Sequence, residues 1–123
     1  MGFKFERLEV WQKAIDFANT MFDIADTLPQ RYQFSLGEQL RRAALSIPTN
    51  IAEGSGRDNP KESGYFYRIS KGSVYECVSL LVMIGKRDHL EREAYQQHRT
   101  DADELAAMLT GLMRAQDRDR EER

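Results

Sequence analysis

Six basic side chains in the middle of the chain have the clearest potential for binding chemistry. They are Arg41, Arg42, Arg57, Lys61, Arg68 and Lys71. Clustered cationic groups bind phosphate, and Tyr65 and Tyr67, which are interleaved with them, have faces on which unpaired bases can stack. Glu38 and Glu62 dilute this charge, and a charged outer face of a helix is often simply solvated. The sequence predicts a basic surface for RNA or DNA, with a solvated helix face as the alternative.

A second set of polar side chains falls on one face of each of two predicted helices. Together these residues are Arg42, Ser46, Asn50, Glu53, Ser73 and Glu76. Because buried polar groups must be paired, we expect the two sets to meet in a polar seam, where Glu76 accepts hydrogen bonds from Arg42 or from the Asn50 amide. Such a seam would fix the register of the two helices more than it would stabilise them.

Pro48 lies inside the same segment, where a proline costs roughly 3 kcal/mol because it lacks an N–H and crowds the carbonyl of Ala44. Ser46, Thr49 and Asn50 can offset this cost by binding a freed carbonyl or holding a water molecule. The sequence therefore predicts a proline-kinked second helix. The kink is either a bend around a neighbouring helix or a functional notch.

The residue types that usually carry catalysis lack suitable partners. Cys77 lies on an apolar face with no neighbour to stabilise a thiolate, and His98 occupies a core stripe, where we expect a hydrogen-bonded core histidine. Glu53 and Glu76 have neither an acid partner nor a water-activating metal, and the two histidines of the chain do not have the spacing of a metal site. We therefore expect no enzyme activity, no metal and no cofactor.

The overall charge disfavours a strongly basic nucleic-acid binder. The 123 residues suit one domain, and their net charge is −2 with a pI of about 5.7. However, residues 31–87 hold nine Lys and Arg against five Asp and Glu, whereas the rest of the chain holds nine against fifteen. A basic middle is therefore compatible with an acidic chain.

The sequence also indicates the compartment. The N-terminal stretch MGFKFERLEVW lacks the apolar core of a signal peptide, and Ser79 breaks the longest apolar run, so we expect no membrane span. A lone cysteine excludes an internal disulfide. The chain is predicted to be cytoplasmic.

Apolar periodicity predicts four helices and no strand. The first helix ends at Leu28, before Pro29, and the second begins at about Leu36, after a capping box formed by Ser35 and Glu38. The third is capped by Asn59 and ends at about Lys86, and the last begins near Asp88. We predict an all-α, antiparallel up-down four-helix bundle over residues 1–115, followed by a charged, disordered tail over residues 116–123.

Two of the predicted helices have notable apolar faces. The apolar arc of the first helix is wider than one core face requires, with Val10, Phe17 and Ile24 at its margin. These three residues indicate either a broad core face or an interface with a second subunit. The core stripe expected for the third helix is Phe66, Ile69, Ser73, Glu76, Leu80 and Met83.

Three segments resemble one protein family: LEVWQKA, QLRRAALSIPTNIAEG and GSVYE. They are similar to the bacterial four-helix-bundle proteins that include the 23S ribosomal RNA intervening-sequence-encoded protein. The same fold group contains the accessory variability protein of diversity-generating retroelements. The resemblance extends from about Phe5 to Leu112.

The resemblance implies a cytosolic homo-oligomer, a ring-like pentamer in known relatives, and no catalytic residues. In the retroelement relative, the pentamer binds a reverse transcriptase and nucleic acid through a positive surface, whereas this chain is net acidic. We therefore expect a non-enzymatic, pentameric adaptor or scaffold that binds nucleic acid or a nucleic-acid-handling protein. The alternative is a structural or protein-interaction module with no role on nucleic acid.

Overall fold

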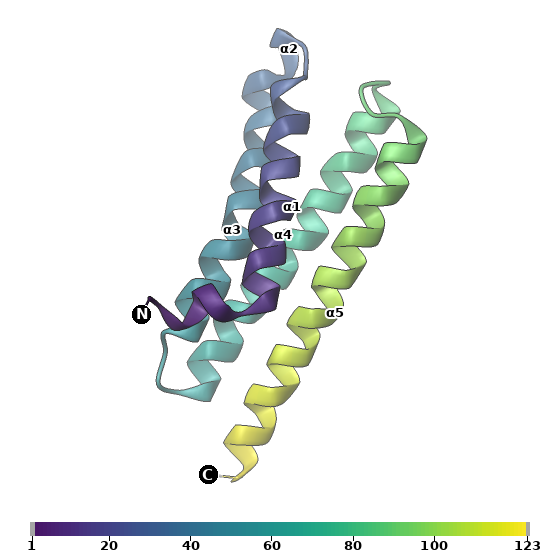
Figure 1. Cartoon of the computed structure of the whole chain (residues 1–123). Helices are drawn as coiled ribbons and strands as arrows, with labels where there is room; N and C mark the ends of the chain where they lie inside the picture. The colour runs from purple at the N-terminus through teal and green to yellow at the C-terminus, as the bar shows by residue number, and fades with distance from the viewer. Residues whose placement is uncertain (1, 123) are drawn as a thin grey trace.

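Four long helices make up most of the chain in the computed structural model (Figure 1). They are α1 (Glu9–Asp26), α3 (Glu38–Ser55), α4 (Pro60–Lys86) and α5 (Arg92–Glu122). The structure describes residues 2–122, apart from the side chains of residues 120 and 122. Within that range there is no strand, and the predicted all-α four-helix bundle is confirmed.

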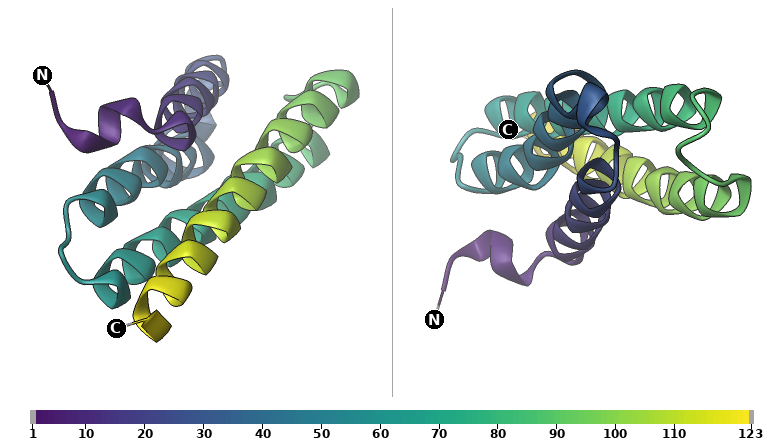
Figure 2. Two further views of the ribbon diagram at one scale, coloured as in Figure 1. Left: turned by 60° about the horizontal axis from the view of Figure 1, so that its bottom comes forward. Right: turned by 90° about the horizontal axis from the view of Figure 1, so that it is seen from above.

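The helices pack in the order α1, α3, α4 and α5. Helix α3 packs against α1 and α4, α4 also packs against α5, and α1 meets α5 less extensively. A 3₁₀ turn, η1 (Lys4–Arg7), precedes α1 and contacts α3; Figure 2 shows this N-terminal segment running at a steep angle to α1. The short α2 (Gln30–Tyr32) and the α4–α5 connection lie at the same end of the bundle (Figure 1).

The third predicted helix begins and ends where the sequence indicated. The side chain of Asn59 accepts a hydrogen bond of 2.8 Å from the backbone N–H of Lys61, and Pro60 occupies the first turn of α4. Asn59 therefore satisfies one of the N–H groups that lack a partner at a helix start.

The capping box expected at Ser35 and Glu38 is wrong. The chain is already helical from Gln30, passes through the π-helix η2 (Gln33–Gly37) and enters α3 without a side-chain cap. The Ser35 hydroxyl instead donates to the Tyr32 carbonyl oxygen. Because the preceding turns supply carbonyl partners, the start of α3 has no orphan N–H groups for a cap to satisfy.

The three residues at the margin of the apolar arc of α1 are buried within the single chain. Val10, Phe17 and Ile24 are 4%, 5% and 9% exposed, so they form part of the core and are not free to contact another subunit. The prediction of an oligomer interface at these three residues is wrong. Helix α1 needs a broad apolar face because it packs against both α3 and α5.

The predicted core stripe of α4 is also wrong in part. Glu76 is exposed, and Ile69 and Met83 are 36% and 50% exposed. The buried face of α4 instead includes Tyr67, Ser70, Ser73, Val74, Cys77, Leu80, Leu81 and Ile84. Helix α4 carries apolar residues on two sides, so periodicity alone did not show which side faces the core.

Helix α5 differs from its prediction at both ends. Asp88 has a φ of 65°, a left-handed conformation that does not fit inside a right-handed helix. Asp88 therefore lies in the connection after α4, and α5 begins at Arg92. The helix continues to Glu122 through most of the segment predicted as a disordered tail; residue 123 lies outside the described range.

In the described part of the chain, no helix combines the length and apolarity needed to cross a bilayer.

Candidate functional site

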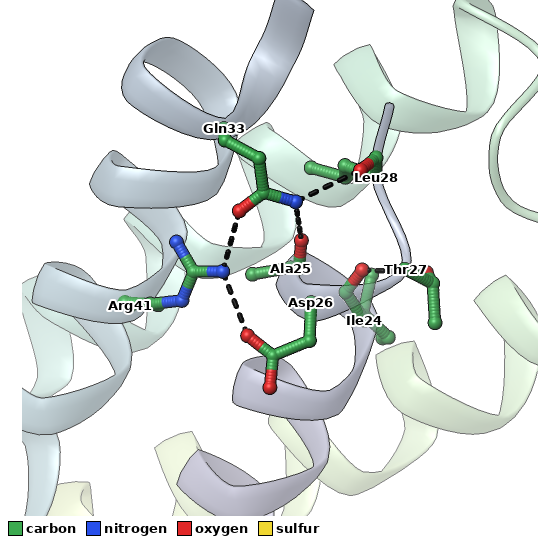
Figure 3. A network of polar contacts seen from close by, with 7 residues as sticks. All are labelled: Ile24, Ala25, Asp26, Thr27, Leu28, Gln33 and Arg41. Atoms are coloured by element: carbon green, nitrogen blue, oxygen red, sulfur yellow. Dashed lines mark hydrogen bonds and ion pairs between the residues drawn. The ribbon is translucent and has the colours of Figure 1, made fainter. Parts of the chain in front are cut away.

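Arg41 is held in a network that joins α1 to α3 (Figure 3). Its Nη2 donates to Asp26 Oδ1 and to Gln33 Oε1, each at 2.7 Å. The Gln33 amide in turn donates to the carbonyl oxygens of Ala25 and Leu28, at 2.9 and 2.8 Å. These carbonyls lie at the C-terminal end of α1, where helical partners are missing. Arg41 therefore has a structural role in closing the α1–α3 connection.

Arg57 and Lys71 also have partners within the chain. Arg57 Nη2 donates to Glu53 Oε2 at 2.8 Å, and its guanidinium lies 4.7 Å from the centre of the Phe66 ring. Lys71 Nζ lies 6.0 Å from the centre of the Tyr75 ring. The charge of Arg57 is thus partly neutralised by a carboxylate.

The six predicted basic residues do not gather into one patch. Arg42, Lys61 and Arg68 are exposed, but Arg41 and Arg57 lie at opposite ends of α3. This helix has 18 residues, and at a rise of 1.5 Å per residue it is about 27 Å long. Of the two tyrosines expected to stack on bases, Tyr65 is 56% exposed and Tyr67 is buried at 3%.

The structure brings together three of the six residues predicted for the polar seam. The Asn50 amide donates to the carbonyl and hydroxyl oxygens of Ser46, at 2.8 and 2.9 Å, and the Ser73 hydroxyl donates to Ser46 Oγ at 2.8 Å. Arg42, Glu53 and Glu76 are exposed and lie outside this contact. A neutral seam avoids the cost of burying a carboxylate.

Ser70 belongs to the same contact and was missed. Its buried hydroxyl donates to the carbonyl oxygen of Ile47 at 2.9 Å, which joins α4 to α3 beside Pro48. The available signal was the spacing of Ser63, Ser70 and Ser73, which places small hydroxyl residues on one face of α4. Helix α3 runs through Pro48 as one continuous element.

A second cluster that sequence analysis missed lies at the opposite end of the bundle from the α3–α4 connection. Arg87, at the end of α4, donates from Nε and Nη2 to the Tyr32 hydroxyl, at 2.9 and 2.7 Å. The guanidinium of Arg31 lies 4.8 Å from the centre of the same ring, and the His89 ring meets it edge-on at 5.5 Å. The two guanidinium groups lower the pKa of the Tyr32 phenol from its ordinary value, with Arg31 as the larger cause and Arg87 as the second.

An apolar groove runs between η1, α1 and α3. We call it the α1–α3 groove; its volume is about 530 Å³, and it is lined by the apolar residues Phe5, Trp11, Ile15, Leu45, Pro48 and Ala52 together with Thr49, Glu53, Gly56 and Arg57. The Phe5 and Trp11 rings pack with their centres 4.9 Å apart. Leu45 is 56% exposed, so the groove presents apolar surface to its surroundings.

Large apolar side chains also follow the outer side of α4. We call this surface the α4 ridge; it consists of Tyr65, Ile69, Tyr75, Val82 and Met83, all at least 36% exposed. At 100° per residue these five positions fall on one side of the helix. The ridge and the α1–α3 groove are different surfaces on different helices.

The comparisons with known proteins agree with the sequence resemblance. The model of the family described as 23S rRNA-intervening sequence protein matches residues 6–111. The chain belongs to this family. No curated protein matches the chain.

A solved structure shows the same fold for this 23S rRNA-intervening sequence protein. It is a protein of unknown function from the S23 ribosomal protein family of Bacteroides thetaiotaomicron, with 20% identity and a TM-score of 0.78. The similarity covers 85% of this chain and 97% of that one. At this identity the likeness supports the fold alone.

In this member of the 23S rRNA-intervening sequence protein family, both Cys77 and His98 have buried polar atoms. Burial raises the pKa of the Cys77 thiol to about 12. His98 was expected to be fully hydrogen-bonded, but its Nδ1 is buried without a partner among the described atoms. Among the described residues, no three His, Cys, Asp or Glu side chains are grouped so as to hold a metal ion.

Proposed function

We propose that this protein is a non-enzymatic, cytoplasmic scaffold or adaptor that works as a homo-oligomer, with a ring of five copies as its assembled form. The observation that carries this proposal is the α4 ridge, where five large apolar side chains are each at least 36% exposed in the single chain. Exposed apolar patches of this kind mark protein–protein contacts.

The presence of two different apolar surfaces supports a ring over a two-fold dimer. A two-fold dimer pairs a surface with itself, whereas a ring repeats one contact between two different surfaces. The α4 ridge and the α1–α3 groove are such a pair of surfaces. The ridge lies on the outer side of one helix, and the groove is a hollow between two others. The number five comes from the resemblance to ring-forming relatives.

A charge placed on the α4 ridge tests the assembly. In Ile69→Glu, a carboxylate replaces an apolar side chain that is 36% exposed in the single chain, so we expect the bundle to fold and the oligomer to dissociate. The matched control is Phe34→Glu, because Phe34 is 81% exposed and lies on η2, outside both surfaces. Sedimentation velocity that gives both variants the same size as the wild type would contradict the proposed interface.

We further propose that the partner of the scaffold is nucleic acid or a nucleic-acid-handling protein. The support is the family's name, which refers to 23S rRNA, together with the exposed cations Arg42, Lys61 and Arg68. Repetition of these scattered charges around a ring would add weak phosphate contacts by multivalency.

A scaffold that binds only proteins is the second candidate, and a specific observation favours it. The chain is net acidic, and carboxylates neutralise two of the predicted basic residues, Arg41 and Arg57. Binding to a mixture of RNA and DNA at several salt concentrations separates the two candidates. Affinity that falls steeply with salt supports a nucleic-acid partner, whereas absence of binding at low salt leaves the protein-only scaffold.

A further inference from the structure

We propose that Arg31 and Arg87 form a binding site for a phosphate group, at the end of the bundle where α2 meets the α4–α5 connection. Both arginines belong to one chain, so the site is present in every copy and does not depend on assembly. The proposal therefore goes beyond the scaffold role and stands or falls separately from it.

The first support is the convergence of the two guanidinium groups on Tyr32. Their central carbons lie 4.8 Å (Arg31) and 5.6 Å (Arg87) from the centre of the ring. The two charges are therefore no further apart than the sum of these distances, about one Debye length at 0.1 M salt (~10 Å). At this separation their potentials reinforce each other.

The second support is that this positive charge is left without a carboxylate. The ion pairs between described side chains join Lys13 to Glu104, Arg41 to Asp26 and Arg57 to Glu53. Among the described side chains, no carboxylate oxygen lies within 4.0 Å of the guanidinium nitrogens of Arg31 or Arg87. Even Asp88 and Glu91, which follow Arg87 closely in the chain, do not form an ion pair with either arginine. Two like charges repel each other, and an anion held between them would relieve this repulsion.

The third support is that the arrangement is held in place before any ligand binds. The backbone N–H of Tyr32 donates to the Pro29 carbonyl oxygen at 2.8 Å, and that of Arg87 donates to Met83 at 3.0 Å. The phenol fixes the Arg87 guanidinium through two hydrogen bonds, and the His89 ring packs against the phenol. A ligand therefore meets little ordering cost at Arg87, whereas Arg31 is positioned by its contact with the Tyr32 ring.

The chemistry of the donors indicates a phosphate group. Arg87 uses two of its five N–H groups on the phenol, so donors remain for an anion, and a planar guanidinium fork matches two phosphate oxygens. The Tyr32 ring already contacts two guanidinium groups and an imidazole, which leaves it unsuited to stacking a base. The site would therefore bind the phosphate of a nucleic-acid backbone or of a small phosphate compound, without reading a base.

The test measures binding of a labelled, short single-stranded RNA to the full chain at low salt by fluorescence anisotropy, with inorganic pyrophosphate as competitor. We expect the double variant R31Q/R87Q to bind about tenfold or more weakly, since it loses charge-assisted contacts. Its slope of log affinity against log salt should be shallower by about 0.7, the value for one phosphate contact on a single strand. Complete displacement of the RNA by pyrophosphate points to a small phosphate ligand, and incomplete displacement to the backbone.

The matched control is R99Q/R114Q, which removes two exposed arginines on α5 and should change the affinity less than about twofold. Because Arg87 also links α4 to Tyr32, circular dichroism is used to check that R31Q/R87Q is folded. If the double variant is unfolded, the single variant Arg31→Gln replaces it in the test. Arg31→Gln should still weaken RNA binding several-fold. Wild-type protein that does not bind the RNA at low salt, or R31Q/R87Q and Arg31→Gln variants that bind like the wild type, would overturn the proposal. The mass of the same samples reports assembly independently.

Discussion

At the scale of single residues, small hydroxyl side chains hold α3 against α4. Ser70 and Ser73 of α4 donate to Ile47 and Ser46 of α3, at 2.9 and 2.8 Å, beside Pro48. The sequence predicted Ser46, Asn50 and Ser73 because buried polar groups need partners. It wrongly added Arg42, Glu53 and Glu76, because spacing along a helix does not tell a buried polar position from a solvated one next to it.

We expect Ser70→Ala to destabilise the protein. The variant removes the hydrogen bond from a fully buried hydroxyl to the Ile47 carbonyl oxygen, which should lower the free energy of unfolding by about 1 kcal/mol. Urea denaturation measures the change. The control is Ser79→Ala, at an exposed position on the same helix, and equal midpoints for the two variants would contradict the role assigned to Ser70.

We expect the Cys77 thiol to be unreactive in the folded protein. Burial, and secondarily the charge of Glu76, raises the pKa of this thiol to about 12. An exposed thiol is half ionised at about pH 8.5. At this pH a thiol reagent should therefore label Cys77 only after urea unfolds the chain. Stoichiometric labelling of native protein at this pH would contradict the assigned environment.

The same pKa shift predicts a loss of stability in alkali. Because the pKa is higher in the folded than in the unfolded state, the contribution is fully present below the unfolded value of about 8.5 and declines as pH rises above it. Denaturation midpoints should fall above this pH in the wild type. The fall should be smaller in Cys77→Ala, and parallel pH profiles for the two proteins would show that Cys77 is not the cause.

At the scale of elements, Gly54 allows α3 and α4 to approach closely. A Cβ at this position would lie 2.6 Å from Cε1 of Tyr67 and 3.1 Å from the Ser63 carbonyl oxygen. Tyr67 is 3% exposed, so its ring has little room to move. Gly54 lies in the last turn of α3, and its use in the structure is a close helix contact.

We expect opposite effects from two glycine-to-alanine substitutions. Gly54→Ala should destabilise by about 1–3 kcal/mol through overpacking against Tyr67. Gly72→Ala, inside α4 with nothing within 4 Å of the added Cβ, should stabilise by up to about 1 kcal/mol because alanine favours the helix. Denaturant midpoints that shift in the same direction for both variants would contradict this account of the α3–α4 contact.

Helix existence was predictable, but helix orientation and the connections were not. Apolar periodicity located all four long helices, and Asn59 with Pro60 located the start of α4. The face of α4 was misassigned because Ile69 and Met83, which continue an apolar pattern, lie on its outer side. The Arg31–Tyr32–Arg87 cluster joins residues 55 positions apart, a tertiary contact that no local pattern contains.

At the scale of the whole molecule, the chain presents two apolar surfaces and one pair of arginines without a carboxylate partner. The α4 ridge and the α1–α3 groove supply two different apolar surfaces, as repeated contacts around a ring require. The two unpaired arginines lie at the α2 end of the bundle, where Arg87 follows Met83 of the α4 ridge by one helical turn. Neither arginine is one of the apolar residues assigned to assembly.

The most direct test of the proposed scaffold is the mass of the wild-type protein in solution, measured at micromolar concentration by native mass spectrometry or sedimentation velocity. Our account predicts a single species of five times the 14.3 kDa chain mass. A compact species of 14.3 kDa at that concentration would contradict it.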